Sequence, residues 1–284
     1  SVLTPLSWEL SSVPLGFDGG FGNGDIRVND RRAGMNWYTI DPIFYSNQRP
    51  DGLNDQDVSD YKTRRVFIDE IFPDTDVVQG QPQVLFPMEI DYYPQERGQY
   101  NFAAAANGTN NLPNPEQNFA GITRQITNTD FEQSNVEFIE FWLLDPFIYP
   151  ENATNNGGTI TFNLGSISED VLRDGRKQFE NGLPADGGTA QTQSTAFGRV
   201  PQNQSLVYAF DTEGQQRINQ DVGYDGLMDA EEAAMFPAFG GVPDPSNDNY
   251  NYFLNTDGPI VERYRQYNGS EGNSPTEVTQ DNHG

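Results

Sequence analysis

The sequence predicts a mostly-β fold: a jelly-roll-like β-sandwich with one short helix and an EF-hand-like calcium loop in a largely irregular C-terminal part. Short runs of alternating apolar and polar residues are the first indication. The 28 glycines and 19 prolines imply many turns, and the 19 phenylalanines and 13 tyrosines can fill a core. We expect residues 1–200 to form the sandwich and residues 201–284 to pack on it as an extension.

Several short strands are expected in the N-terminal half. Residues 36–45 fit a strand interrupted by a proline, and residues 64–72 fit a short helix or a strand equally well. Residues 84–93 alternate apolar and polar side chains, and Pro87 favours an edge position or a bulge there. Another short strand is expected at residues 121–126. Glycine-rich and acidic loops would connect these strands.

The strongest strand pattern lies at residues 136–144, where nearly every side chain is apolar. Because both faces of this run are apolar, we expect a central strand that is covered on both sides. Residues 159–164 alternate cleanly, with Ile160, Phe162 and Leu164 on the inward face. Both runs therefore predict strands of the sandwich.

One helix is expected at about residues 168–180. Ser166 and Glu169 match the capping-box spacing, and apolar residues follow at helical intervals. Basic residues gather toward the expected C-terminal end, where the helix dipole favours cations, and Gly182 supplies the stop. Residues 204–210 are a further strand candidate, and the part of the chain that follows the calcium loop is expected to be irregular.

Residues 221–232, DVGYDGLMDAEE, match the twelve-residue EF-hand scheme at all but one ligand position. Gly226 takes the turn position. Gly223, at position 3, supplies no oxygen, so a water or an outside residue would have to replace it. No entering helix is evident before the loop, which favours a structural calcium site over a switch; the alternative is an acidic turn in an acid-rich chain. The expected ligands at positions 1, 5, 7, 9 and 12 are Asp221, Asp225, the carbonyl of Leu227, Asp229 and Glu232.

Acidic residues dominate the whole chain. The 42 acidic and 16 basic residues give a net charge of −26, and Lys62 and Lys177 are the only lysines. Such a field repels nucleic acid and anionic lipid headgroups, and adaptation of the source organism to salt is its simplest explanation. Asp244, Asp248 and Asp257, beyond the calcium loop, form a second and weaker candidate for a cation site.

The composition excludes several kinds of site. The chain has no cysteine, which rules out disulfides, thiolate metal sites and cysteine nucleophiles. His283 is its one histidine, so the chain alone can form neither a Ser-His-Asp triad nor a multi-histidine metal centre. No apolar run approaches about 18 residues, so no membrane-spanning helix is expected.

Catalysis is not expected either. Glu89 and Asp91 share one strand face, but a retaining β-sandwich glycosidase needs a third acid on that strand, and Pro94 stands in its place. Glu137 and Glu140 fall on opposite faces and cannot pair directly. Aromatic residues that could stack on sugars keep a carbohydrate-binding module of a secreted protein open as the alternative. They are Tyr92, Tyr93, Tyr100, Trp142, Tyr250, Tyr252, Tyr264 and Tyr267.

Eight strings of the sequence, taken together, resemble one known family. They are NWYTID (36–41), YYPQERGQYNF (92–102), NTDFEQSNVEFIEFWLLDPF (128–147), FNLGSISEDVLRDGRKQFENGLP (162–184), GRVP (198–201), QDVGYDGLMDAEE (220–232), DPSNDNYNYF (244–253) and RYRQYNGSEGNSP (263–275). In this order they resemble the SprA/Sov family, the giant outer-membrane translocon of type IX secretion, which is also tied to gliding motility. The strings are colinear and are spread over most of the chain, from residue 36 to residue 275.

The resemblance implies that the chain is a fragment of a much larger, non-enzymatic protein, a soluble cap-like domain inserted between the strands of the translocon barrel. Its partners would be the rest of the barrel, a lipid-facing barrel subunit, a periplasmic plug and the secreted cargo in transit. The resemblance implies no nucleic acid, no direct membrane insertion and no catalytic residues. It places the domain outside the cytoplasm at the outer membrane, with the cell surface favoured over the periplasm.

Overall fold

The computed structural model describes residues 4–76, 78, 80, 83–126, 130–133, 135–148, 157–176, 183–184, 186, 191–203 and 214–269. The chain divides into two compact units. The first unit comprises Ser1–Thr123 and Glu169–Gly284, and the second comprises Arg124–Ser168.

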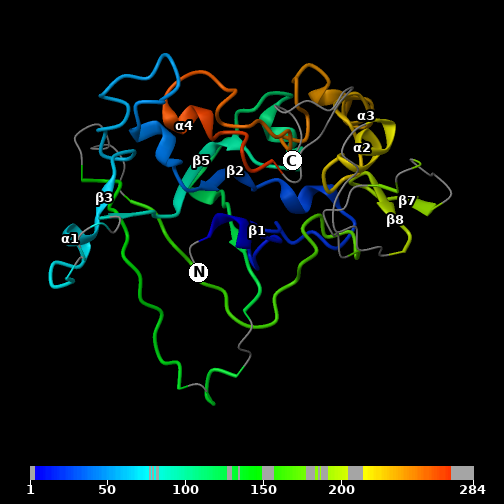
Figure 1. The fold of residues 1–284 in the computed structure, drawn as a ribbon. Helices are drawn as coiled ribbons and strands as arrows, with labels where there is room; N and C mark the ends of the chain where they lie inside the picture. Colours follow the sequence, from blue (N-terminus) through cyan, green and yellow to red (C-terminus); the bar gives the residue numbers. More distant parts are fainter. Residues whose placement is uncertain are drawn as a thin grey trace. The chain divides into compact units, whose positions relative to one another are not determined.

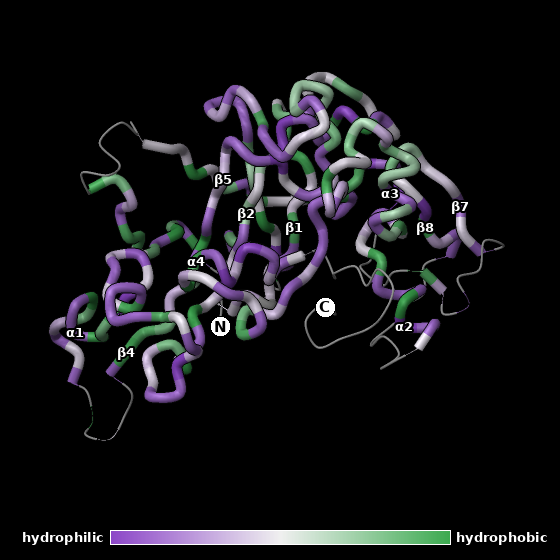
Figure 2. The backbone as a smooth tube through the Cα atoms, turned by 90° about the horizontal axis from the view of Figure 1, so that it is seen from above, coloured by the Kyte–Doolittle hydropathy of each residue, from purple (hydrophilic) through white to green (hydrophobic). Residues whose placement is uncertain are grey.

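The first unit is mostly non-helical, and its described strands form small antiparallel pairs (Figure 1), in agreement with the expected β-rich class. The pairs are β1 (Glu9–Leu10) with β6 (Ile122–Thr123), β2 (Ala33–Tyr38) with β5 (Glu89–Arg97), β3 (Val66–Phe67) with β4 (Val84–Leu85), and β7 (Thr192–Ser194) with β8 (Arg199–Pro201). Purple, hydrophilic stretches recur along this unit in Figure 2, as expected for so acidic a chain.

Short helices connect these pairs. The α-helices of the described residues are α1 (Ile68–Ile71), α2 (Gly214–Gln220), α3 (Asp229–Met235) and α4 (Ile260–Arg263). Single 3₁₀ turns lie at Pro5–Ser7, Ile26–Asn29, Pro42–Tyr45, Ala104–Ala106, Pro115–Gln117 and Pro237–Phe239. No described helix has the length and apolarity needed to cross a membrane.

Prolines decide where the two longest expected strands of the N-terminal half are cut. The run at residues 84–93 splits around Pro87, which has no N–H to donate, into β4 and β5. The run at residues 36–45 ends at Tyr38, because Pro42 opens a 3₁₀ turn whose first amide is capped by Asp41: the Ile43 N–H donates to Asp41 Oδ1 at 2.8 Å. Residues 64–72 contain both candidates, since β3 runs directly into α1.

Glu89, at the start of β5, is mostly buried next to Asp91. Burial, with the Asp91 charge adding to it, raises the pKa of Glu89 from its ordinary value of 4.5 to about 7. A carboxyl whose pKa is higher in the folded than in the unfolded chain binds its proton more tightly when folded. The free energy of unfolding therefore falls as pH rises from about 4.5 to about 7.

Glu89→Gln should therefore flatten the fall in melting temperature between pH 5 and pH 7, values that bracket most of this roughly two-unit window. The measurement is thermal unfolding followed by circular dichroism across that range, at constant ionic strength. Glu116→Gln, at an exposed position, is the matched control and should leave the slope unchanged. Equal slopes in wild type and Glu89→Gln would contradict the prediction.

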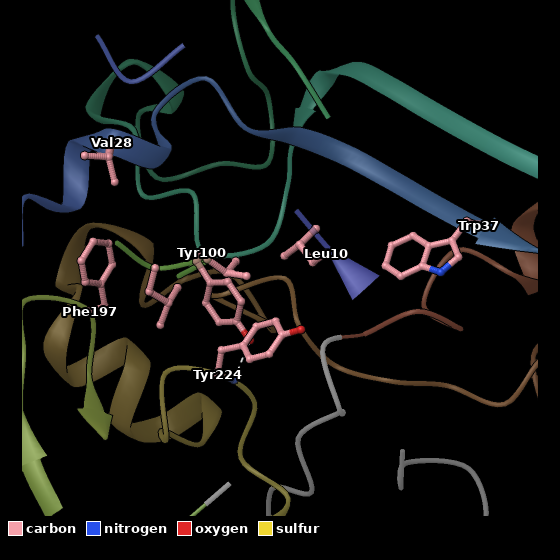
Figure 3. Packing of buried hydrophobic residues seen from close by; sticks show 8 residues of the cluster. Leu10, Val28, Trp37, Tyr100, Phe197 and Tyr224 are labelled. Carbon is pink, nitrogen blue, oxygen red and sulfur yellow. Dashed lines mark hydrogen bonds between the residues drawn. The ribbon is translucent and has the colours of Figure 1, made fainter. Parts of the chain in front are cut away.

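Two large apolar clusters lie in the core of the first unit, with a small third cluster of Ala33, Ala103 and Leu112. One gathers segments far apart in the chain around Tyr100, and Figure 3 labels Leu10, Val28, Trp37, Tyr100, Phe197 and Tyr224 among its residues. The other packs the C-terminal part against β2. There Tyr38 and Tyr264 stack with their ring centroids 4.0 Å apart, and Phe253 stacks on Tyr264. The C-terminal part, although poor in regular structure as expected, is therefore part of the core.

The second unit corrects the strongest strand prediction. Its described residues contain no strand, so residues 136–144 are not the central strand that was expected, and residues 159–164 are not a strand either. The side chains of both runs are largely exposed: Phe138 is 75% and Trp142 is 72% exposed. The rings of Phe141 and Phe162 lie 5.4 Å apart, which joins the two runs. A run that is apolar on both faces needs two covering layers, and this unit does not supply them.

The predicted helix at residues 168–180 is also wrong over residues 168–176, while residues 177–180 lie outside the described part of the chain. Asp170 instead closes a turn by accepting hydrogen bonds from the amides of Asp174 (3.3 Å) and Gly175 (2.9 Å). Arg173 has φ 54° and pairs with Asp18 at 2.8 Å. Turn chemistry and this long-range ion pair override the helical spacing. The strand candidate at residues 204–210 lies outside the described residues.

Candidate metal centre

The acidic loop at residues 221–232 lies between two helices. α2 ends at Gln220, directly before the loop, and α3 begins at Asp229 within it. The expectation that no entering helix precedes the loop is therefore wrong. The Glu231 carboxylate accepts a hydrogen bond from the Met228 amide at 3.2 Å, which caps α3, and the acidic first turn suits the positive end of the helix.

Strand β8 holds the loop from one side. The Arg199 amide donates to the Asp225 carbonyl at 2.7 Å, and the Arg199 guanidinium pairs with Glu231 at 3.0 Å. Gly226 has φ 67°, a left-handed conformation, and a Cβ there would lie 2.1 Å from the Arg199 carbonyl. The loop therefore needs glycine at its turn position for two independent reasons.

Carboxylates converge at this loop in two groups, and within each group they lie close enough to hold a metal ion. Asp225, Glu232 and Asp248 form the first group, and Asp229, Glu232 and Asp244 form the second. In each, one carboxylate oxygen per residue lies within 4.8 Å of the others. Glu232 belongs to both groups and is 0% exposed. The first group is fully buried, whereas the second is partly exposed.

Ser246 orients two of these carboxylates. Its hydroxyl donates to Asp225 Oδ2 at 2.8 Å, and its amide donates to Glu232 Oε2 at 2.9 Å. Asp225 Oδ1 is oriented by the Leu227 amide at 3.0 Å. These donors hold the carboxylates of Asp225 and Glu232 toward one another before any ion binds.

We expect Ser246→Ala to weaken calcium binding about tenfold, because groups that orient metal ligands typically contribute 10- to 100-fold to affinity. The measurement is isothermal titration calorimetry of the chelator-treated chain with calcium. Ser59→Ala removes a hydroxyl from an exposed loop and is the control, with no expected change. Equal affinities for Ser246→Ala and wild type would show that the serine does not orient the ligands.

Burial and mutual repulsion dominate the electrostatics of the centre. Burial raises the pKa of Asp225 to about 7 and that of Asp244 to about 6. Burial, followed by the charges of Asp225 and Asp244, raises the pKa of Glu232 to about 10. The pKa of Asp248 is also far above its usual range, again through burial and then the neighbouring carboxylates. Buried like charges of this kind are stable when protonated or when a cation joins them.

Two arginines lie near the centre, but its carboxylates outnumber them. Arg97 lies near Asp244 and Glu232, whose charges favour its ionised form; burial lowers the Arg97 pKa to about 10, so it stays charged at neutral pH and faces the five carboxylates of the two groups. Arg217 pairs with Asp221 at 2.8 Å, and both side chains are buried. A divalent cation bound by carboxylate oxygens would supply the missing positive charge.

The structure brings together only part of the expected ligand set. Asp225, Asp229 and Glu232 lie in the two groups. Asp221 belongs to neither group and is ion-paired. The Leu227 amide, as described, donates to Asp225, and the Leu227 carbonyl as a ligand stays a prediction.

The three residues of the second acidic cluster, Asp244, Asp248 and Asp257, do not stay together in the structure. Asp244 and Asp248 join the loop carboxylates, whereas Asp257 is exposed and belongs to neither group. Spacing along the chain could not show that the two acidic clusters form one centre. The role of Ser246 was missed as well, although its place between Asp244 and Asp248 was a signal.

Known proteins provide no further assignment for the centre. No protein-family model matches the chain, and no curated protein is significantly similar to it. What the chain does is therefore inferred from its own residues and from the strings quoted above.

Proposed function

We propose that this chain is a non-enzymatic, cap-like soluble domain of a type IX outer-membrane translocon. Its β-rich first unit, jelly-roll-like in arrangement, would be braced by calcium at an EF-hand-like loop. The colinear strings motivate the translocon role, and the buried carboxylate centre motivates the metal. In this role the domain supports protein export and gliding motility as a scaffold at the cell surface, without chemistry of its own.

Calcium fits the donor set better than other biological metals. The centre offers carboxylate oxygens, which calcium and magnesium prefer, and the chain has no cysteine and a single histidine to attract softer metals. Magnesium demands strict octahedral geometry and keeps several waters, whereas calcium tolerates irregular, crowded sites. Asp225 and Glu232 would bind the ion in the first group, and Asp229 would join Glu232 in the second.

The observation that best supports membership in a larger assembly is the number of exposed apolar side chains in the second unit. Patches larger than a few hundred Å² are rare on monomeric soluble proteins and mark interaction sites. In our proposal the rest of the translocon covers these residues, with the barrel and its accessory subunits as partners. The exposed large apolar residues of this unit are Ile126, Val136, Phe138, Ile139, Phe141, Trp142, Leu143, Leu144, Phe147, Ile148, Ile160, Phe162, Leu164 and Ile167.

Site-specific photo-crosslinking in the producing bacterium tests this proposal. A photoreactive residue at Trp142 should crosslink to peptides of the translocon, identified by mass spectrometry. The same probe at Leu15, an exposed apolar position of the first unit, controls for nonspecific capture. Crosslinks from Trp142 that match those from Leu15, or that contain only unrelated proteins, would contradict the translocon role.

The carbohydrate-binding alternative has less support. Tyr100 and Tyr264, two of the aromatic residues considered for stacking on sugars, are 1% and 0% exposed and present no free ring face. Asp91, considered with Glu89 for catalysis, accepts a hydrogen bond from the buried Tyr38 hydroxyl at 2.7 Å. Specific binding of the chain to polysaccharides on a glycan array would revive this alternative.

A further inference from the structure

The calcium loop lacks one ligand, and the structure shows what lies in its place. Position 3 of the EF-hand scheme is Gly223, which has φ +65° and no side chain. A Cβ built on Gly223 would lie 2.1 Å from Asp248 Oδ2 and 3.2 Å from Asp248 Cγ. The Asp248 carboxylate thus occupies the space that a side chain at position 3 would fill.

Asp248 has two properties expected of a metal ligand: it is buried, and its carboxylate oxygens are poorly supplied with hydrogen bonds. It is 0% exposed, and neither of its carboxylate oxygens accepts a hydrogen bond of normal geometry from the described residues, although the Tyr100 hydroxyl lies close enough to lower the pKa of Asp248 slightly against the larger effect of burial. The cost of burying an unsatisfied carboxylate is high, so such a group calls for an explanation. One of its oxygens lies within 4.8 Å of carboxylate oxygens of both Asp225 and Glu232, which hold positions 5 and 12 of the loop.

The segment that carries Asp248 is held in place by the end of β5. The Arg97 guanidinium donates to the Pro245 carbonyl at 3.0 Å, and the Tyr100 amide donates to the Ser246 carbonyl at 2.8 Å. Asn247 has φ 54°, and its side-chain amide donates a hydrogen bond to the Arg97 carbonyl at 3.1 Å. Together with the hydrogen bonds from Ser246 to Asp225 and Glu232, these contacts position Asp248 beside the loop.

Tyr100, which holds the Asp248 segment through its amide, also contacts the calcium loop through its side chain. Its hydroxyl accepts a hydrogen bond from the Tyr224 amide at 2.8 Å, next to Gly223 in the chain. Figure 3 shows the two tyrosines side by side with this bond drawn as a dashed line. The loop and the Asp248 segment are therefore fixed relative to one another by β5 and the residues that follow it.

We propose that Asp248 supplies, from a separate segment of the chain, the oxygen ligand that position 3 of the calcium loop lacks. The ion is then bound by Asp225 and Glu232 from the loop and by Asp248 from outside it. Calcium in this arrangement joins two segments that the sequence keeps apart, which makes it a brace of the tertiary fold. This inference rests on the calcium part of the proposed function and is independent of the translocon part.

The first test is calcium titration of the 284-residue chain by isothermal calorimetry, with Asp248→Asn and Asp257→Asn as a matched pair. Asp248→Asn keeps the shape and removes the charge, and should weaken binding about a hundredfold or more, because even groups that only orient ligands contribute 10- to 100-fold. Asp257→Asn, at an exposed position outside both carboxylate groups, should bind as wild type does. Wild-type affinity in Asp248→Asn would overturn the inference.

Thermal unfolding separates loss of a ligand from loss of the fold. In chelator, Asp248→Asn should melt at or above the wild-type temperature, because it removes an unsatisfied buried carboxylate. With calcium added, it should gain much less stability than wild type. A variant that melts well below wild type in chelator would show that Asp248 has an ordinary packing role, which would count against the inference.

Moving the carboxylate back into the loop provides a second, constructive test. Gly223→Asp combined with Asp248→Gly places the acid at position 3 and removes its clash with Asp248, while the Tyr100 hydroxyl, 3.0 Å from that Cβ, has to shift by a few tenths of an ångström. Asp is among the residues that tolerate a left-handed φ. This double variant should bind calcium at least tenfold more tightly than Asp248→Gly alone, by the same reasoning on ligand contributions. No recovery would contradict the assignment of Asp248 to position 3.

The outcomes also separate this inference from the proposed function. A wild-type chain that takes up no calcium overturns the calcium brace and the Asp248 assignment together. A wild-type chain that binds calcium while Asp248→Asn binds it equally well leaves the calcium part of the proposed function standing and overturns only the assignment of Asp248. Neither result bears on the photo-crosslinking test of the translocon role.

Discussion

Chelation of calcium should lower the melting temperature of the 284-residue chain by roughly 5–10 °C relative to the calcium-saturated chain. An ion present at a hundred times its dissociation constant contributes about 2.7 kcal/mol, and about 1 kcal/mol shifts the melting temperature of a domain of this size class by roughly 2–4 °C. The direction follows from the centre itself. Without a cation, Asp225, Glu232 and Asp248 are buried together, and their ionised forms repel one another.

Differential scanning calorimetry with and without chelator is the appropriate measurement. Sodium chloride matched in ionic strength is the control, because a chain of net charge −26 also gains stability from general screening. Magnesium in place of calcium should stabilise the chain less, since it gives up its waters reluctantly. A melting temperature that does not change with chelator would remove calcium from the account.

Replacing apolar side chains of the second unit should change the solution behaviour of the chain as strongly. Phe138, Phe141 and Trp142 are 75%, 55% and 72% exposed, and they lie close together in the sequence. We expect the wild-type chain to self-associate at about 100 μM, in the range where exposed apolar surface drives aggregation. The triple substitution of these residues by serine should leave a predominantly monomeric chain.

Sedimentation velocity at several concentrations would measure this change. Leu15→Ser is the control: Leu15 is 97% exposed, but it is a single apolar residue in the first unit, and its loss should change nothing. A wild-type chain that remains monomeric at the highest concentration would mean that this surface does not need a partner. That result would weaken the argument that the chain is part of a larger assembly.

That the acidic side chains of residues 221–232 come together could be predicted, because their spacing is local. Asp225, Asp229 and Glu232 are four and three residues apart, and α3 places Asp229 and Glu232 one turn from each other. Asp248 could not be assigned in this way, since its place beside Gly223 depends on hydrogen bonds that Arg97 and Tyr100 make to the segment around it. Gly223 indicated that a ligand was missing, but the sequence could not identify the residue that replaces it.

The strand prediction at residues 136–144 was wrong for a related reason. An apolar pattern on both faces of a run indicates that both faces favour burial. It does not show whether the rest of the chain packs against them. Tyr264 presents the opposite case. It lies in a polar, aromatic C-terminal part expected to be irregular, and it is 0% exposed because it stacks on Tyr38, more than two hundred residues earlier. Contacts of this range leave no periodic pattern in the sequence.

The central claim is that the buried carboxylates form a calcium brace, and a crystal structure of the calcium-loaded chain tests it most directly. We predict an ion with oxygens of Asp225, Glu232 and Asp248 within about 2.3–2.6 Å, the usual calcium–oxygen distance. If crystals grown in saturating calcium showed the three carboxylates hydrogen-bonded to one another, with no ion between them, the claim would be contradicted.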